Sequence, residues 1–140
     1  MLPRTSANAS VEHSKEIEIR WRDLDVYGHV NHVVFLTYLE ECRDEWLGLV
    51  LGDPGEIWNY VVVRVAIDYR RELSQADDII VAHCRLQGIG TSSVRTAERI
   101  LTRQGVLAVE AEAVLVARDQ ETGRSRPLTS AERTALERVA

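Results

Sequence analysis

The sequence contains little cysteine, one lysine and no long run of apolar residues. Cys42 and Cys84 are its two cysteines in 140 residues, too few for a metal framework, and a chain of this length can bury a core without disulfides. We therefore predict two buried free thiols. No apolar run approaches the ~18 residues that a membrane helix requires, and residues 1–16 lack the apolar segment of a secretory signal. We expect no membrane partner and, by default, a cytoplasmic location.

The charge of the chain argues against nucleic acid as a partner. The sequence has 17 basic and 22 acidic side chains, for a net charge of −5, whereas binding to a phosphate backbone needs a basic surface. Apart from Lys15 every basic residue is arginine, whose planar guanidinium suits phosphate groups. A small ligand that carries phosphates therefore remains compatible with this composition.

The hydrophobic periodicity predicts one α+β domain over residues 16–140, after a flexible N-terminal tail over residues 1–15. Short loops between the later strands favour antiparallel pairing, and one long helix can cover one face of a five-stranded antiparallel sheet. Apolar residues on the other face, together with the open sheet edges, suggest a homo-oligomer. The expected elements are strands at 16–21, 61–69, 80–86, 92–102 and 107–117, a helix at 32–51, and a short helix that Ser130 caps.

The densest polar cluster runs from Arg22 to His32, between the first strand and the long helix. It holds two carboxylates, two histidines, an asparagine and a tyrosine. The helix that follows presents unpaired backbone N–H groups and the positive end of its dipole. A carboxylate can act as a base or nucleophile, and fixed N–H donors can hold an oxyanion. The cluster therefore suits attack on a carbonyl carbon, with Asp25 as the candidate carboxylate, whereas Asp23 has an equally plain interpretation as a loop and capping residue.

The pattern Arg-x-x-Asp-x-Asp-x-x-Gly-His-Val-Asn that ends at Asn31 resembles the signature of hotdog-fold acyl-CoA thioesterases, above all the 4-hydroxybenzoyl-CoA thioesterase-like group. Residues 69–73 and 90–93 also look like this family. The resemblance implies a hotdog fold, in which the sheet wraps around a long central helix. It also implies hydrolysis of acyl-CoA to a free acid and coenzyme A with no further cofactor, in a homodimer or homotetramer whose site lies between subunits.

By the same resemblance, Asp25 matches the catalytic carboxylate and the backbone N–H of His32 matches the oxyanion donor. His29 matches a histidine of the related plant acyl-carrier-protein thioesterases. Those plant enzymes carry asparagine where this chain has Tyr27, and many relatives have a second asparagine in place of His32. Candidate substrate-binding residues are Tyr27, Asn31, Glu40, Arg70, Arg71, Ser92 and Ser93, and further candidate pocket aromatics are Phe35, Tyr38 and Trp58.

Each of these binding residues also has a structural interpretation. Asn31 is a good helix cap, Glu40 can be a solvated helix residue, and Ser92 and Ser93 can be ordinary strand residues. The arginines 70 and 71 can hold coenzyme A phosphates, or they can pair with Glu72 and Asp77. The four aromatic residues can equally belong to the core.

Several functional alternatives remain open at the level of sequence. A metal held by Asp25, His29 and His32 has only weak support from the spacing, so we predict none. Asp25 can attack directly or activate water, and the sequence does not separate the two routes. The acyl group can be presented on an acyl-carrier protein instead of coenzyme A. A hotdog dehydratase or hydratase, or a module that binds acyl-CoA without turnover, would share much of this pattern.

Overall fold

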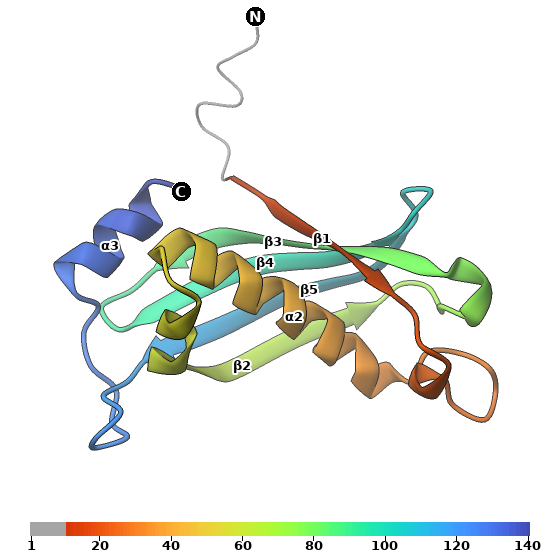
Figure 1. Ribbon diagram of the computed structural model, residues 1–140, viewed down its shortest axis with the longest axis horizontal. Helices are drawn as coiled ribbons and strands as arrows, with labels where there is room; N and C mark the ends of the chain where they lie inside the picture. Colours follow the sequence, from red (N-terminus) through yellow and green to blue (C-terminus); the bar gives the residue numbers. More distant parts are fainter. Residues whose placement is uncertain (1–10) are drawn as a thin grey trace, which may run out of the picture.

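The five strands of the computed structural model, which describes residues 11–140, form one antiparallel sheet. The spatial order is β1-β3-β4-β5-β2, so β1 and β2 are the sheet edges. The long helix α2 lies across one face of the sheet, and α3 packs at one end (Figure 1). The strands are β1 (His13–Glu18), β2 (Tyr60–Tyr69), β3 (Ile79–Ile89), β4 (Ser93–Thr102) and β5 (Leu107–Ala117); the α-helices are α2 (His32–Leu51) and α3 (Ser130–Glu137); the 3-10 turns are η1 (Trp21–Asp23), η2 (Pro54–Asn59) and η3 (Gln75–Asp77).

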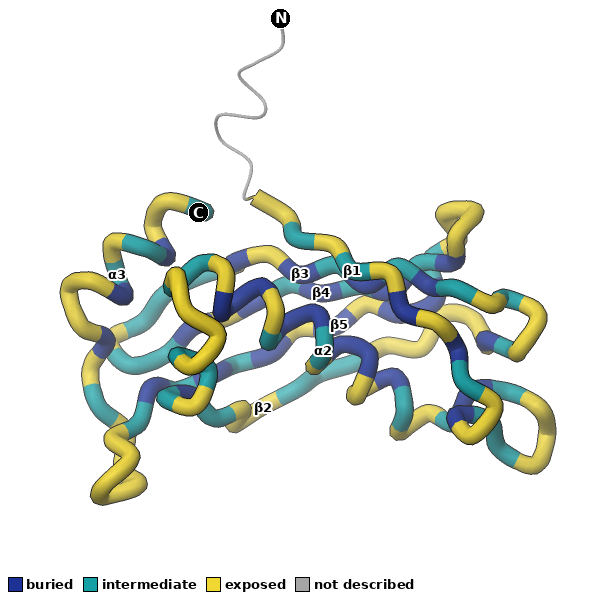
Figure 2. Tube along the Cα trace, viewed as in Figure 1, coloured by how far each residue is buried: buried dark blue, intermediate teal, exposed yellow. Residues whose placement is uncertain are grey.

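The boundaries of α2 agree with those predicted from sequence. The Asn31 side chain accepts a hydrogen bond from the backbone N–H of Val33, which caps the helix start. Gly52 ends the helix in the left-handed conformation, with φ of 84°, where a side chain would be strained. Phe35, Tyr38 and Leu39 begin the buried stripe that faces the sheet, and Figure 2 shows that stripe along the helix. The core therefore lies between α2 and the inner face of the sheet.

The first strand differs from the prediction at both ends. It begins at His13, three residues before the expected Glu16, and it ends at Glu18. Trp21 was predicted on the apolar face of this strand, but it lies in η1 with 82% of its surface exposed. The strand stops because the Asp23 side chain accepts a hydrogen bond from the backbone N–H of Arg20, which turns the chain. Residues 1–10, most of the predicted tail, lie outside the described residues.

A β-bulge in β2 overturns the prediction that Val61 to Tyr69 share one apolar face. The register against β5 shifts between Val62 and Arg64, so one extra residue interrupts the alternation. Val61 and Tyr69 consequently point to opposite faces of the sheet. Because of the bulge, Tyr69 lies on the face of the sheet that α2 covers, next to the start of that helix.

The C-terminal helix is anchored to β2 by a buried polar cluster. Thr129 caps α3, one residue before the predicted Ser130, and exchanges hydrogen bonds with Glu132. The carboxylate of Glu132 also accepts hydrogen bonds from the Tyr60 hydroxyl at 2.6 Å and from the Arg126 guanidinium at 2.8 Å. Both cysteines are buried and free, as predicted. Among residues 11–140, none of the helices combines the length and apolarity needed to cross a membrane.

Candidate active site

A tight turn places Asp25 beside His29. The backbone N–H of Asp25 donates to the His29 carbonyl at 2.8 Å, and that of Gly28 donates to the Asp25 carbonyl at 3.1 Å. Gly28 has φ of 80°, a conformation that favours glycine. The turn is joined to the loop after β2, because the N–H of Val30 donates to the Leu73 carbonyl at 2.7 Å. The cluster predicted from sequence is thus a turn held by hydrogen bonds directly before the N-terminus of α2.

Two backbone N–H groups orient the carboxylate of Asp25. Its Oδ1 accepts from Tyr27 at 2.9 Å and from His29 at 3.3 Å. Among residues 11–140 the hydrogen bonds to this carboxylate all fall on Oδ1, which leaves Oδ2 for other chemistry. The carboxylate lies at a cavity of about 330 Å³ whose lining residues are Asp25, His29, Val30, His32, Phe35, Tyr69, Arg70, Arg71 and Glu72.

The first turn of α2 brings an N–H donor to the same cavity. Asn31 takes two of the helix's first N–H groups, since its Oδ1 accepts from Val33 at 3.1 Å and its carbonyl accepts from Val34 at 2.8 Å. The N–H of His32 donates to no acceptor within the part of the chain that the structure describes. His32, whose N–H lies at the positive end of the helix dipole, therefore lines the same cavity as Asp25.

Aromatic rings form one wall of the cavity. The rings of Phe35 and Tyr69 meet edge to face, with centroids 5.4 Å apart, and the Tyr69 hydroxyl donates to the His32 carbonyl at 2.9 Å. His29 and Glu72 also line the cavity, and Nε2 of His29 lies 3.2 Å from a carboxylate oxygen of Glu72. The cavity thus combines an apolar wall, an oriented carboxylate and a free helix N–H.

The structure assembles some of the predicted binding residues and separates others. Arg70 and Arg71 line the cavity, but each guanidinium contacts an acid of this chain, Glu110 at 3.1 Å and Asp77 at 3.2 Å respectively. Tyr27 is 81% exposed and contributes its backbone N–H to Asp25. Asn31 acts as the helix cap.

Three other candidates lie away from the cavity within one chain. Glu40 is exposed on α2 and does not line it. Ser92 and Ser93 lie at the opposite end of the sheet, where Ser93 pairs with Val116, whereas Tyr69 pairs with Val109. Of the remaining aromatics, Phe35 lines the cavity, Tyr38 is fully buried in the core and Trp58 is largely exposed.

Tyr69 and Glu72 are cavity residues that sequence reasoning did not select. Tyr69 was assigned to the apolar face of its strand, and Glu72 was considered only as an ion-pair partner of the arginines. The sequence signal that could have identified both residues is that they belong to the stretch from 69 to 73, which resembles the family. The bulge in β2, which alternation alone does not reveal, determines where the Tyr69 ring points.

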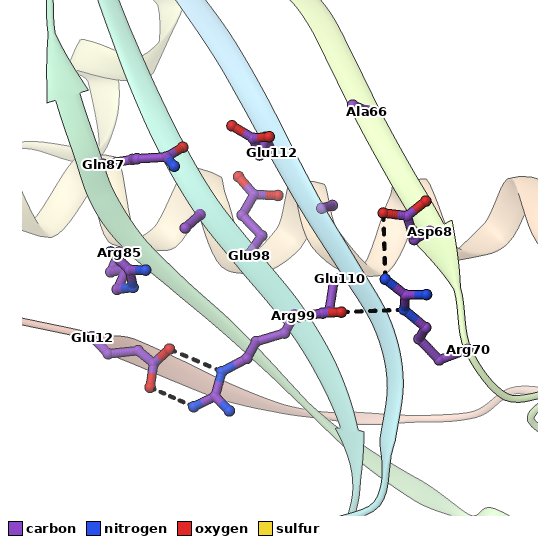
Figure 3. A pocket seen from close by; sticks show the side chains of 12 residues that line it. Glu12, Ala66, Asp68, Arg70, Arg85, Gln87, Glu98, Arg99, Glu110 and Glu112 are labelled. Atoms are coloured by element: carbon purple, nitrogen blue, oxygen red, sulfur yellow. Dashed lines mark hydrogen bonds and ion pairs between the residues drawn. The ribbon is translucent and has the colours of Figure 1, made fainter.

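A larger hollow of about 670 Å³ lies on the sheet face away from α2 (Figure 3). Several arginines and acids in its lining pair with one another, such as Arg99 with Glu12 and Arg70 with Asp68 and Glu110. None of its lining residues lies at the start of a helix, whereas the smaller cavity combines a helix start with the Asp25 carboxylate, so the smaller cavity is the candidate active site. Within residues 11–140 no group of three or more His, Cys, Asp or Glu side chains is arranged to hold a metal ion.

This fold and this cavity define a hotdog-fold thioester hydrolase, and comparison with known proteins agrees. The model of the family described as "Thioesterase-like superfamily" matches residues 19–136, and the chain belongs to that family. The long-chain acyl-CoA thioesterase FadM of Escherichia coli is 30% identical over 129 residues, which cover 89% of this chain and 96% of that protein. The resemblance predicted from sequence is therefore confirmed.

Solved structures give the same fold. A Thermus thermophilus thioesterase in complex with coenzyme A and zinc is 32% identical, with a TM-score of 0.82 over 91% of this chain and 92% of its own. A Bacillus stearothermophilus protein shares the fold at 23% identity, with a TM-score of 0.84 over 93% of this chain and 97% of its own.

Proposed function

We propose that this protein hydrolyses acyl-CoA thioesters, with Asp25 as the reacting carboxylate and the His32 N–H as the oxyanion donor. The observation that supports this proposal most is that Asp25 and His32 line one cavity, and that two backbone N–H groups bind Oδ1 of Asp25 and leave Oδ2 for the reaction. Coenzyme A as the leaving group is supported by the Thermus thermophilus relative, which binds it, and by FadM, which is named for acyl-CoA substrates.

The chemistry of a thioester explains why one carboxylate can suffice. A thiol has a pKa of about 8.5, so the thiolate leaves without the strong acid assistance that an amine requires. As the carbonyl carbon is attacked, negative charge develops on its oxygen, and an N–H donor at a helix start stabilises that charge. The C–S bond then breaks, and the thiolate of coenzyme A takes up a proton from solvent.

Two routes for the carboxylate are consistent with this geometry. Asp25 can attack the thioester carbon and form an anhydride that water then hydrolyses, or it can remove a proton from a water molecule that attacks directly. Both routes give a free acid and coenzyme A. His29, whose ring lies on the cavity rim, orients the substrate or the carboxylate in either route.

The decisive experiment measures thiol release from a panel of acyl-CoAs for the wild type and for Asp25→Asn. The panel runs from acetyl to palmitoyl and includes benzoyl and hydroxybenzoyl thioesters. We expect the variant to lose at least about 100-fold in kcat on the best substrate. Asp119→Asn is the matched control, because Asp119 also accepts two backbone N–H bonds, at 2.8 and 3.0 Å, in a loop that does not line the cavity. Full activity in both Asp25→Asn and Asp25→Ala would refute the assignment.

An acyl-carrier protein is the alternative source of the thioester. The Arg70 and Arg71 side chains at the cavity rim could meet phosphates of coenzyme A or of a carrier's prosthetic arm. Rates on the carrier-bound and coenzyme A forms of one acyl chain separate the two. We expect the coenzyme A form to react faster.

We also propose that two chains pair through their β2 edges. β2 is an edge strand, and its bulge region exposes Val62 and Val63. Antiparallel pairing of the two edges would bring the Ser92–Ser93 end of one protomer toward the Tyr69 end of its partner. Those serines would then approach the cavity from the second subunit. Light scattering should give a mass at least twice 15.8 kDa, and a monomer at assay concentration would contradict the pairing.

A further inference from the structure

The segment from Tyr69 to Ser74 bonds both to the turn that carries Asp25 and to His32. On one side, the Leu73 carbonyl accepts from Val30, and Ser74 forms a β-bridge with His29, so this segment holds the turn that carries Asp25. On the other side, the Tyr69 hydroxyl donates to the His32 carbonyl. The relative position of carboxylate and oxyanion donor therefore depends on this segment.

The Tyr69 contact is an isolated one. Within residues 11–140 it is the one hydrogen bond that joins β2 to α2, since β2 lies at the sheet edge beyond β5. The Tyr69 ring also stands edge-on to the rings of His32 and Phe35, at centroid distances of 6.3 and 5.4 Å. The ring thus forms part of the cavity wall, while the hydroxyl binds the carbonyl of His32, which also lines the cavity.

We propose that Tyr69 is a positioning residue for the reaction. It holds the first turn of α2 so that the His32 N–H meets the oxyanion that forms when Asp25, or a water molecule activated by Asp25, attacks the thioester carbon. This proposal rests on the proposed function. The hydroxyl acts through His32 and does not touch the substrate. Partial burial raises the pKa of Tyr69, so the phenol stays a hydrogen-bond donor through the neutral range.

Two properties separate this role from a merely structural one. Removal of the hydroxyl leaves the aromatic wall in place, so substrate binding should change little. Instead, kcat should fall, because a misplaced N–H donor stabilises the oxyanion of the transition state less well. A structural hydrogen bond would instead change thermal stability and leave the rate constant of the folded enzyme unaltered.

The test compares Tyr69→Phe with Tyr60→Phe. Both variants lose one hydroxyl from the same strand, at opposite ends, and the Tyr60 hydroxyl is bound to Glu132 in the core and does not line the cavity. We expect Tyr69→Phe to lower kcat about five- to ten-fold on the best acyl-CoA, with KM within two-fold and the melting temperature nearly unchanged. We expect Tyr60→Phe to lower the melting temperature and to keep the wild-type kcat.

The outcomes distinguish this proposal from the proposed function. If Tyr69→Phe keeps the wild-type kcat while Asp25→Asn abolishes activity, the thioesterase assignment stands and the positioning role of Tyr69 is wrong. A rise in KM at constant kcat would also overturn it, because the ring wall would then be the important feature. If Asp25→Asn and Asp25→Ala both keep full activity, the proposed function fails first.

Discussion

The hydroxyl of Tyr38 donates a 2.6 Å hydrogen bond to Oδ2 of Asp23, and both residues are buried. The same oxygen accepts from the backbone N–H and the side chain of Arg20. Burial alone would raise the pKa of Asp23, but the hydrogen bonds from Tyr38 and Arg20 outweigh it and hold the pKa below its usual range. This contact anchors the chain two residues before Asp25 to the second turn of α2.

We therefore expect Tyr38→Phe to lower the free energy of unfolding by about 1–3 kcal/mol, because a buried carboxylate loses a hydrogen-bond partner. Urea denaturation at neutral pH measures the change. Tyr27→Phe is the control in the same region, since Tyr27 is exposed, and it should stay within about 0.5 kcal/mol of wild type. Equal stability of the two variants would show that the Asp23 contact contributes little.

A second prediction concerns acid stability. Burial alone would raise the pKa of Glu132, but hydrogen bonds from Arg126, Thr129 and Tyr60 outweigh it and lower the pKa from 4.5 to about 2. A carboxyl whose folded pKa is depressed contributes stability above its unfolded pKa and loses it as pH falls through the folded pKa. We expect Glu132→Gln to melt below wild type at pH 7, and the gap to close between about pH 4.5 and pH 2. A gap that is constant with pH would contradict this.

The buried ion pair between α2 and β4 gives a third prediction. Arg43 donates to both carboxylate oxygens of Glu98, at 2.8 and 3.0 Å, and both side chains are almost fully buried. Arg43→Met leaves the Glu98 carboxylate buried without its partner, which should cost about 3–5 kcal/mol. Replacing both residues with Met should restore most of that loss, as measured by denaturant unfolding. A double variant as unstable as the single one would mean that packing, not charge, dominates at this contact.

His29 supplies a fourth prediction. His29→Ala keeps the backbone N–H that binds Asp25, so the variant tests the imidazole alone. We expect kcat/KM for the best acyl-CoA to fall on the order of 10- to 100-fold, because the ring orients the substrate or the carboxylate. Steady-state thiol release measures this, with circular dichroism as the check on folding. Wild-type activity would assign the ring a structural role beside Glu72.

Sequence patterns alone determined most of the fold and the turn that carries the candidate residues Asp25 and His29. Asn31 and Gly52 bound α2 through local backbone chemistry, and the turn from Asp25 to His29 is closed by hydrogen bonds between near neighbours. Short-range interactions of this kind can be predicted from the sequence of a single segment. The family resemblance rests on that same segment, which is why the thioesterase class could be stated before the structure.

Only the tertiary structure decided which distant residues join that segment. The bulge between Val62 and Arg64 reverses the alternation of β2 and turns Tyr69 toward α2, although the residues themselves read as an uninterrupted strand. Ser93 and Glu40 are separated from the cavity because sheet register and helix rotation, not residue type, set their positions. A one-residue shift in a strand moves each later side chain to the other face, and no local pattern here records where that shift occurs.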